Sequence, residues 1–141
     1  MRTRTLLMLA LACGLAIMLA GAVLLFQLAG RGDVAAPVAL GVPATVGDMT
    51  VVVDAATESG GVLDVTVRIG GVDDTDGAGG FRLIASGRPV LALPGDTADA
   101  CTATSLAPRT CHVRFDTSTA DGSSRVLFYE RGDAQARWVI E

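Results

Sequence analysis

The sequence predicts an all-β fold, an antiparallel sandwich of seven to eight short strands, preceded by one N-terminal transmembrane helix. A single apolar stretch runs from Leu6 to Ala29. Downstream of it, short runs alternate between apolar and polar residues with a period of two, and none has a convincing apolar period of 3.6. Turn residues separate these runs at intervals of about ten residues, which is typical of antiparallel sandwiches.

The composition narrows the range of functions. The 141 residues suffice for one domain and a targeting segment. A formal net charge of -4 argues against a protein that binds nucleic acid by neutralising its phosphates. One His and three Cys leave few residues for metal or nucleophilic chemistry. We therefore expect no nucleic-acid partner, no cofactor, no metal site and no catalytic residues.

Residues 6–29 form the expected transmembrane helix, which would act as an uncleaved signal anchor. These 24 residues, at about 1.5 Å each, would reach roughly 36 Å, enough to cross a hydrocarbon core of about 30 Å. Arg2 and Arg4 precede the span. By the positive-inside rule, residues 1–5 are the cytoplasmic N-terminus and the C-terminal part lies outside. The membrane is thus the first expected partner.

Two alternatives remain open for the N-terminal segment. The small residues Ala20, Gly21 and Ala22 fit a signal-peptidase site. Cleavage there would release a secreted protein, but it would leave the apolar segment Val23–Ala29 at the new N-terminus. A lipoprotein would instead be modified at Cys13, although such proteins normally become polar directly after that residue, and here the apolar stretch continues. The length of the stretch favours the anchor.

The part beyond the apolar stretch divides into a stalk and a domain. Residues 30–48 are rich in Gly, Ala and Pro and are interpreted as a stalk with a possible edge strand at Val38–Val42. Residues 49–141 form the extracytoplasmic sandwich. From Gly30 onward, nine Arg oppose fifteen acids, a net charge of -6. We expect this charge to favour solubility and to repel an anionic lipid surface.

The strand signals follow in order along this domain. A β-branched run at Thr50–Asp54 leads through a turn at Glu58–Gly61 to Val62–Ile69, the clearest alternation in the chain. Further strands are expected at Phe81–Ala85, Val90–Leu93, Thr110–Phe115, Arg125–Glu130 and Gln135–Ile140. The predicted core comprises Val51, Val53, Leu63, Val65, Val67, Phe81, Leu83, Val113, Phe115, Phe128 and Trp138.

Cys101 and Cys111 are the two cysteines outside the apolar stretch. They lie in an oxidising compartment if the topology is as expected, and a disulfide is then the default. It would close a loop of about ten residues and stabilise the fold by roughly 2–3 kcal/mol. The spacing does not resemble the C-x-x-C of a redox pair, and one His cannot complete a zinc site.

Two other features have both a chemical and a structural interpretation. The acidic segment Asp73–Asp76 matches half of a calcium loop, yet Val72 stands where a further ligand is needed and no Glu closes the site. We expect a solvated turn there and leave calcium binding open. His112 could act as a base only beside a nucleophile and an orienting acid. Strand alternation places it on the outward face, which predicts an exposed histidine.

Several segments resemble a known family. They are Val46–Asp48 before the first long strand, Val62–Val67, Phe81–Ile84, Leu106–Pro108 ahead of Cys111–Asp116, and Trp138–Ile140. Together they resemble the telokin-like, immunoglobulin-fold domains of secreted lipoproteins and membrane-anchored proteins of Gram-positive bacteria, including small secreted antigens of mycobacteria. The resemblance covers roughly Ala44–Glu141. It implies an immunoglobulin-like sandwich without catalytic residues and without a settled ligand.

We therefore expect a membrane-anchored, extracytoplasmic, immunoglobulin-like module of the bacterial cell envelope. It would act by binding an envelope protein or a cell-wall polymer, without catalysis. The alternative is a secreted sandwich protein, released by signal-peptide cleavage, that binds a free ligand or a host or wall component. The composition, with all eleven cations Arg and no Asn, suggests a GC-rich genome, as in actinobacteria.

Overall fold

The structure is a computed structural model that describes residues 3–30 and 36–141. The chain divides into two compact units, Met1–Val34 and Ala35–Glu141. Three charged residues that flank the apolar stretch, Arg2, Arg31 and Asp33, lie outside the described residues.

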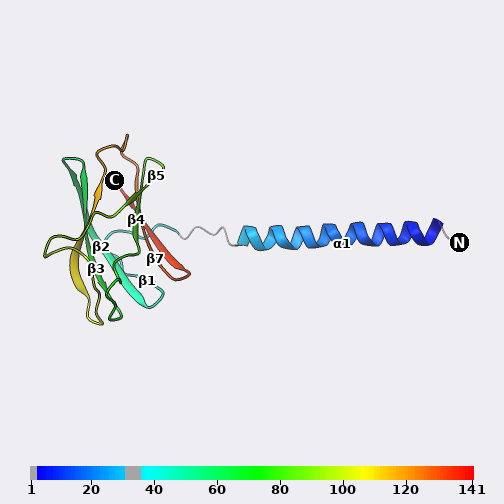
Figure 1. Ribbon diagram of the computed structural model, residues 1–141, viewed down its shortest axis with the longest axis horizontal. Helices are drawn as coiled ribbons and strands as arrows, with labels where there is room; N and C mark the ends of the chain where they lie inside the picture. The colour runs from blue at the N-terminus through cyan, green and yellow to red at the C-terminus, as the bar shows by residue number, and fades with distance from the viewer. Residues whose placement is uncertain (1–2, 31–35) are drawn as a thin grey trace. The chain divides into compact units, whose positions relative to one another are not determined.

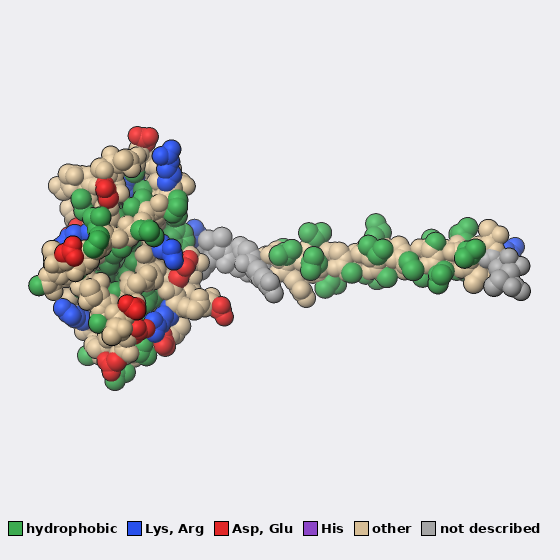
Figure 2. Space-filling view, in the orientation of Figure 1, with side chains coloured by type: hydrophobic (Ala, Val, Ile, Leu, Met, Phe, Trp, Pro, Cys, Tyr) green, Lys and Arg blue, Asp and Glu red, His purple; other side chains and the backbone are tan. Residues whose placement is uncertain are grey.

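The first unit contains one helix, α1 (Thr3–Gly30). Its large apolar side chains between Leu6 and Leu28 are 55% to 83% exposed, and Figure 2 shows apolar side chains along both the upper and the lower edge of the helix. The segment Thr3–Ala29 is long and apolar enough to cross a membrane, a test that a signal sequence also passes. The expected apolar helix is confirmed.

The second unit is an antiparallel β-sandwich of eight strands, which confirms the predicted fold class (Figure 1). Four strands form a sheet in the order β1-β2-β3-β6 and four form a second sheet in the order β5-β4-β7-β8. The strands are β1 (Ala44–Val46), β2 (Met49–Ser59), β3 (Val62–Gly70), β4 (Phe81–Ala85), β5 (Arg88–Leu91), β6 (Arg109–Asp116), β7 (Arg125–Arg131) and β8 (Ala134–Ile140).

A β-bulge in β2 determines which residues face outward near its end. The register against β3 shifts between Val53 and Ala55. Val53 is fully buried before the shift, whereas Thr57 and Ser59 are exposed after it. A bulge adds one residue to one strand and so changes the phase of the alternation. The outer face of this sheet thereby gains two hydroxyl groups at one end.

The core lies between the two sheets and matches the prediction at all but one position. The alternation in β3 is confirmed, with Leu63, Val65, Val67 and Ile69 at most 1% exposed. Phe128 was expected in the core and is only partly buried on the outer face. The reason is that Arg125 occupies an inward position in β7, so that Leu127 and Tyr129 point inward with it. An arginine usually faces solvent, so Arg125 suggests from the sequence that Val126 and Phe128 face the core.

Two of the expected strands differ in the structure. Val38–Val42 is not a strand, because the Val38 amide bonds to Arg137 and Gly41 turns the chain with a φ of 79°. The edge strand is β1, which pairs with the start of β2.

The expected strand at Val90–Leu93 is β5, which begins at Arg88 and includes Pro89. A proline is tolerated there because β5 is an edge strand and its missing amide hydrogen faces no neighbour.

Candidate functional site

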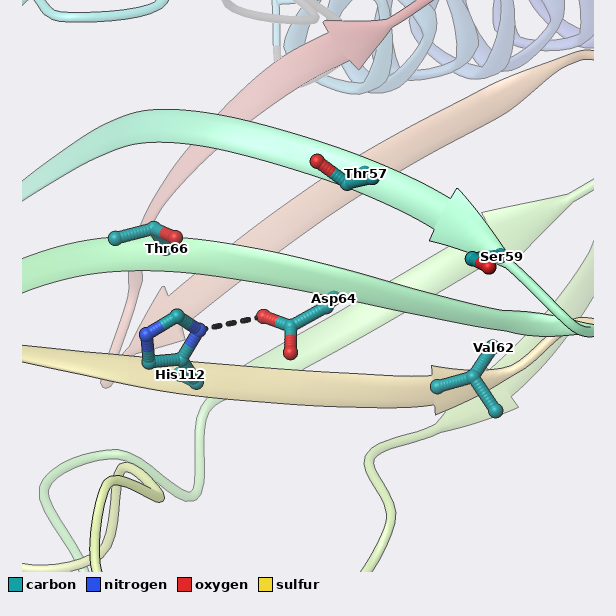
Figure 3. Close-up of a pocket in the computed structure, with 6 residues that line it drawn as sticks. All are labelled: Thr57, Ser59, Val62, Asp64, Thr66 and His112. Atoms are coloured by element: carbon teal, nitrogen blue, oxygen red, sulfur yellow. Dashed lines mark hydrogen bonds and ion pairs between the residues drawn. The ribbon is translucent and has the colours of Figure 1, made fainter.

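An open groove lies on the outer face of the sheet formed by β2, β3 and β6. It has a volume of about 460 Å³. The bulge in β2 contributes the two hydroxyl residues, β3 contributes the central acid, and β6 contributes the histidine (Figure 3). The lining residues are Thr57, Ser59, Val62, Asp64, Thr66 and His112.

Asp64 is the centre of a polar network at this groove. Its Oδ1 atom lies 2.6 Å from Nδ1 of His112 (Figure 3). Its Oδ2 atom accepts a hydrogen bond of 2.8 Å from Nε of Arg114. Neighbouring strands bring these residues together, because Asp64 and Arg114 are directly paired between β3 and β6 and His112 lies two residues away on the same face. Both carboxylate oxygens are therefore engaged.

The network continues into the loop that follows β5. Arg114 donates hydrogen bonds to Asp99, at 2.8 Å and 3.4 Å, and to the Thr97 hydroxyl at 2.7 Å. The Arg114 guanidinium, followed by Thr97, holds the pKa of the Asp99 carboxyl far below its usual range. The second ring nitrogen of His112, Nε2, lies 4.0 Å from Asp99. The loop thus places a second carboxylate, that of Asp99, near the His112 side chain.

This loop covers the outer edge of β6. The Leu93 amide donates to the backbone carbonyl of Arg114 at 2.7 Å, and the His112 amide donates to the backbone carbonyl of Asp99 at 2.8 Å. The disulfide between Cys101 and Cys111 closes the far end of the loop, with their Cα atoms 5.0 Å apart. The loop therefore takes the place of a neighbouring strand at that edge of the sheet.

The groove has acceptors, donors and hydroxyls, but its geometry does not form a nucleophile and base. His112 is directed at Asp64 through one nitrogen and faces Asp99 through the other. In the part of the chain that the structure describes, neither Ser59 nor either of the groove threonines is hydrogen-bonded to the imidazole. A nucleophile must be within hydrogen-bond reach of its base. Across residues 3–30 and 36–141, no group of three His, Cys, Asp or Glu side chains could hold a metal ion.

The acidic segment that suggested half a calcium loop is a turn tied to the sandwich. One Asp74 oxygen accepts the Asp76 amide at 2.9 Å, and the other pairs with Arg131. These two contacts, the Asp76 amide first, lower the pKa of the Asp74 carboxyl. Arg131 also bonds to Asp48 at 2.8 Å. The Asp74 carboxylate is thus engaged by an arginine, which agrees with the expected turn.

The structure brings together the predicted cysteines and gives His112 partners that the sequence did not reveal. His112 does face outward, but its side chain is 32% exposed and lies between two acids. Asp64, Asp99 and Arg114 were missed as a group, since they are separated by up to 50 positions. The sequence does indicate that Asp64 and Arg114 face outward from two clear strands. It does not indicate that those two strands are neighbours in the sheet.

The fold and the groove define a class, an antiparallel β-sandwich with a polar site on one outer face. Two solved structures are similar. One is the yjhA protein from Bacillus subtilis, with a TM-score of 0.55, 11% identity, and coverage of 73% of this chain and 98% of that one. The other is MPT63, a secreted protein from Mycobacterium tuberculosis, with a TM-score of 0.54, 17% identity, and coverage of 75% and 99%. No protein-family model and no curated protein sequence matches the chain. At these identities the likeness concerns the fold.

Proposed function

We propose that this chain is a single-pass membrane protein whose sandwich lies outside the cytoplasm and binds another component of the cell envelope without catalysis. The observation that carries the proposal is α1, which is apolar on all sides and has none of its apolar window buried. A helix that is hydrophobic all round belongs in a large protein core or in lipid. An exposed helix that is apolar all round supports a position in lipid.

The disulfide supports a location of the sandwich on the extracytoplasmic side of the membrane. Disulfides persist in oxidising compartments and are rare in the cytosol. Cys101 and Cys111 are joined, and their loop covers the outer edge of β6. A sandwich kept in the cytoplasm would be expected to hold these thiols reduced. The resemblance to telokin-like domains of exported bacterial proteins agrees with the same location.

The groove supports binding of an extended polar partner. It is open, and the hydroxyls of Thr57, Ser59 and Thr66 make no hydrogen bond within the described residues. Free hydroxyls in a row can donate to and accept from a peptide backbone or a sugar. The Asp64 network is already satisfied, so it would fix the shape of the groove rather than change during binding. A wall polymer or a segment of an envelope protein fits this chemistry.

A secreted protein is the second candidate, and two observations favour it. Ala20, Gly21 and Ala22 provide a possible cleavage site. The fold is similar to that of MPT63, which is described as a secreted protein. In this case the sandwich would act as a free binding protein.

Intact mass of the native protein distinguishes the two. The anchored form keeps all 141 residues, 14.4 kDa, and stays in the membrane pellet after alkaline extraction. Loss of the first 22 residues, with the protein in the medium, would contradict the anchor and support secretion.

The groove is tested separately by a photo-reactive amino acid placed at Thr57. We expect one defined crosslinked product in native membranes, which disappears when Thr66→Arg fills the groove. The same probe at the exposed Thr119 is the matched control, since it lies in the loop that follows β6. Equal products from both positions would contradict a specific groove.

A further inference from the structure

The outer face of the β5-β4-β7-β8 sheet is more apolar than a solvated sheet face. Sheets with one face in water normally alternate apolar residues inward with polar residues outward. Here, six of the outward side chains in these strands are apolar. They are Ile84, Pro89, Leu91, Val126, Phe128 and Val139.

The strand register places these residues in two adjacent rows. In the first row, Ile84 lies between Pro89 and Val126, and Val126 pairs with Val139, so that apolar side chains cross all four strands. The second row begins at Leu91 and continues through β4, β7 and β8. Leu91 is 70% exposed and Val139 is 45% exposed. The rows form one contiguous surface, which we call the apolar sheet face.

Two arginines lie within the second row. Arg82 and Arg137 pair with Phe128 from opposite sides. Glu130 is the one acid that points outward from these four strands, and it lies 3.6 Å from Arg82. The face therefore combines apolar and cationic groups, although the exported part as a whole carries a net charge of -6. Apolar side chains beside arginines suit a surface of anionic headgroups over acyl chains.

The stretch of chain that joins α1 to the sandwich is short. The Val38 amide donates a hydrogen bond of 2.8 Å to the carbonyl of Arg137, which belongs to the second row. Only eight residue steps separate Val38 from Gly30, the last residue of α1. Eight residues span at most about 28 Å in any conformation. If α1 is in a membrane, this short tether makes the lipid surface available to the sandwich.

From the apolar rows, their arginines and the short tether we infer that the apolar sheet face docks on the anionic lipid surface of the membrane that α1 enters. The inference rests on the proposed anchor. It modifies the expectation that the net charge repels such a surface, because the charge would instead orient the domain with this face toward the lipid. A second copy of the chain is a less favourable partner for the apolar sheet face than the lipid surface is. Four strands of about five residues offer roughly 300 Å² per copy, below the roughly 800 Å² per partner of a stable interface.

The test uses the full chain, with Cys13→Ser to remove the free thiol, reconstituted into phosphatidylcholine vesicles with and without about 30% phosphatidylglycerol. An environment-sensitive dye is attached at Val139→Cys, or at Thr57→Cys on the opposite outer face as the matched control. Nitroxide-labelled lipids then quench the dye. We expect quenching at position 139 to be at least about threefold that at position 57, and only with the anionic lipid. Arg82→Gln with Leu91→Ser should reduce it to about half or less.

The outcomes separate the docked face from the anchor. A chain that does not float with the vesicles after alkaline treatment contradicts both. A chain that floats but shows equal quenching at the two positions, or the same quenching without anionic lipid, contradicts the docked face alone. Energy transfer between labelled copies that grows with protein density, without lipid quenching, would assign the face to a second copy. Unchanged quenching in the Arg82→Gln, Leu91→Ser chain would also contradict the inference.

Discussion

Arg125 in β7 and Glu58 in β2 form an ion pair that joins the two sheets at one end of the sandwich. Two hydrogen bonds, of 3.0 Å and 2.9 Å, connect the guanidinium to the carboxylate. Arg125 is 5% exposed and also donates to the carbonyls of Gly122 and Ser124. The Thr117 hydroxyl donates to the same carboxylate at 2.8 Å. An inward-pointing charge near the free end of β2 also discourages pairing with another strand.

The first prediction concerns the loss of this arginine. Breaking a buried ion pair costs about 3–5 kcal/mol, and the cost is reduced here because the Glu58 side chain is 36% exposed. We expect Arg125→Met to lower the free energy of unfolding by about 2 kcal/mol. Adding Glu58→Gln should recover about half of it, because no unpaired carboxylate then remains. Chemical denaturation of the detergent-solubilised chain measures both, and equal stability of Arg125→Met and the unmodified chain would contradict the role of the pair.

The second prediction is a dependence of stability on acid pH. Arg125, and then Thr117, lower the pKa of the Glu58 carboxyl from its ordinary value of 4.5. A carboxyl whose pKa is lower in the folded state contributes stability above its unfolded pKa and loses it as the pH falls through the folded pKa. Stability should therefore decline below about pH 4.5. In Glu58→Gln the decline should be shallower, and identical pH profiles for the two chains would exclude Glu58 as a contributor.

The third prediction concerns the disulfide. Replacing Cys101 and Cys111 by Ser should lower the free energy of unfolding by about 2–3 kcal/mol. Faster amide hydrogen exchange is expected at His112 and Leu93. The His112 amide in β6 donates to the loop, and the Leu93 amide in the loop donates to β6. The loop should remain in place on average, since Arg114 still holds Asp99. Cys13→Ser is the control and should change neither quantity. Unchanged exchange in the double variant would mean that the disulfide does not hold the loop.

The fourth prediction tests the phase of β7. Leu127 is fully buried, whereas its neighbour Phe128 lies on the outer face. Leu127→Ala should cost about 2–5 kcal/mol in unfolding free energy, as is usual for a buried leucine. Phe128→Ala should cost about 1 kcal/mol or less, despite the larger side chain, because the phenylalanine is already partly in water. A larger loss for Phe128→Ala than for Leu127→Ala would contradict the observed phase.

The sequence was most informative where one residue pattern decides the structure alone. Val62–Ile69 alternates without interruption, and β3 has that phase over its full length. In β7 the same reasoning misplaced Phe128, because a buried arginine with a carboxylate partner 67 positions away looks like a surface residue in a local window. Val38–Val42 has the composition of a strand, but its backbone bonds to β8 and β2 at single points. Those partners are tertiary contacts, which a local pattern does not contain.

The candidate site was less accessible from the sequence than the fold was. Alternation placed His112 and Asp64 on outward faces, and the cysteine count predicted the disulfide. The groove itself depends on β3 being the neighbour of β6, and on a bulge at Asp54 that turns Thr57 outward. Strand order and bulges arise from how the sheets pack. No motif in the sequence records them.

Protease treatment of intact cells that carry the full chain with a C-terminal epitope tag tests the central claim most directly. We expect the protease to remove the tag from intact cells while a fragment containing α1 stays in the membrane pellet. A tag that is degraded only after the membrane has been permeabilised would contradict the account.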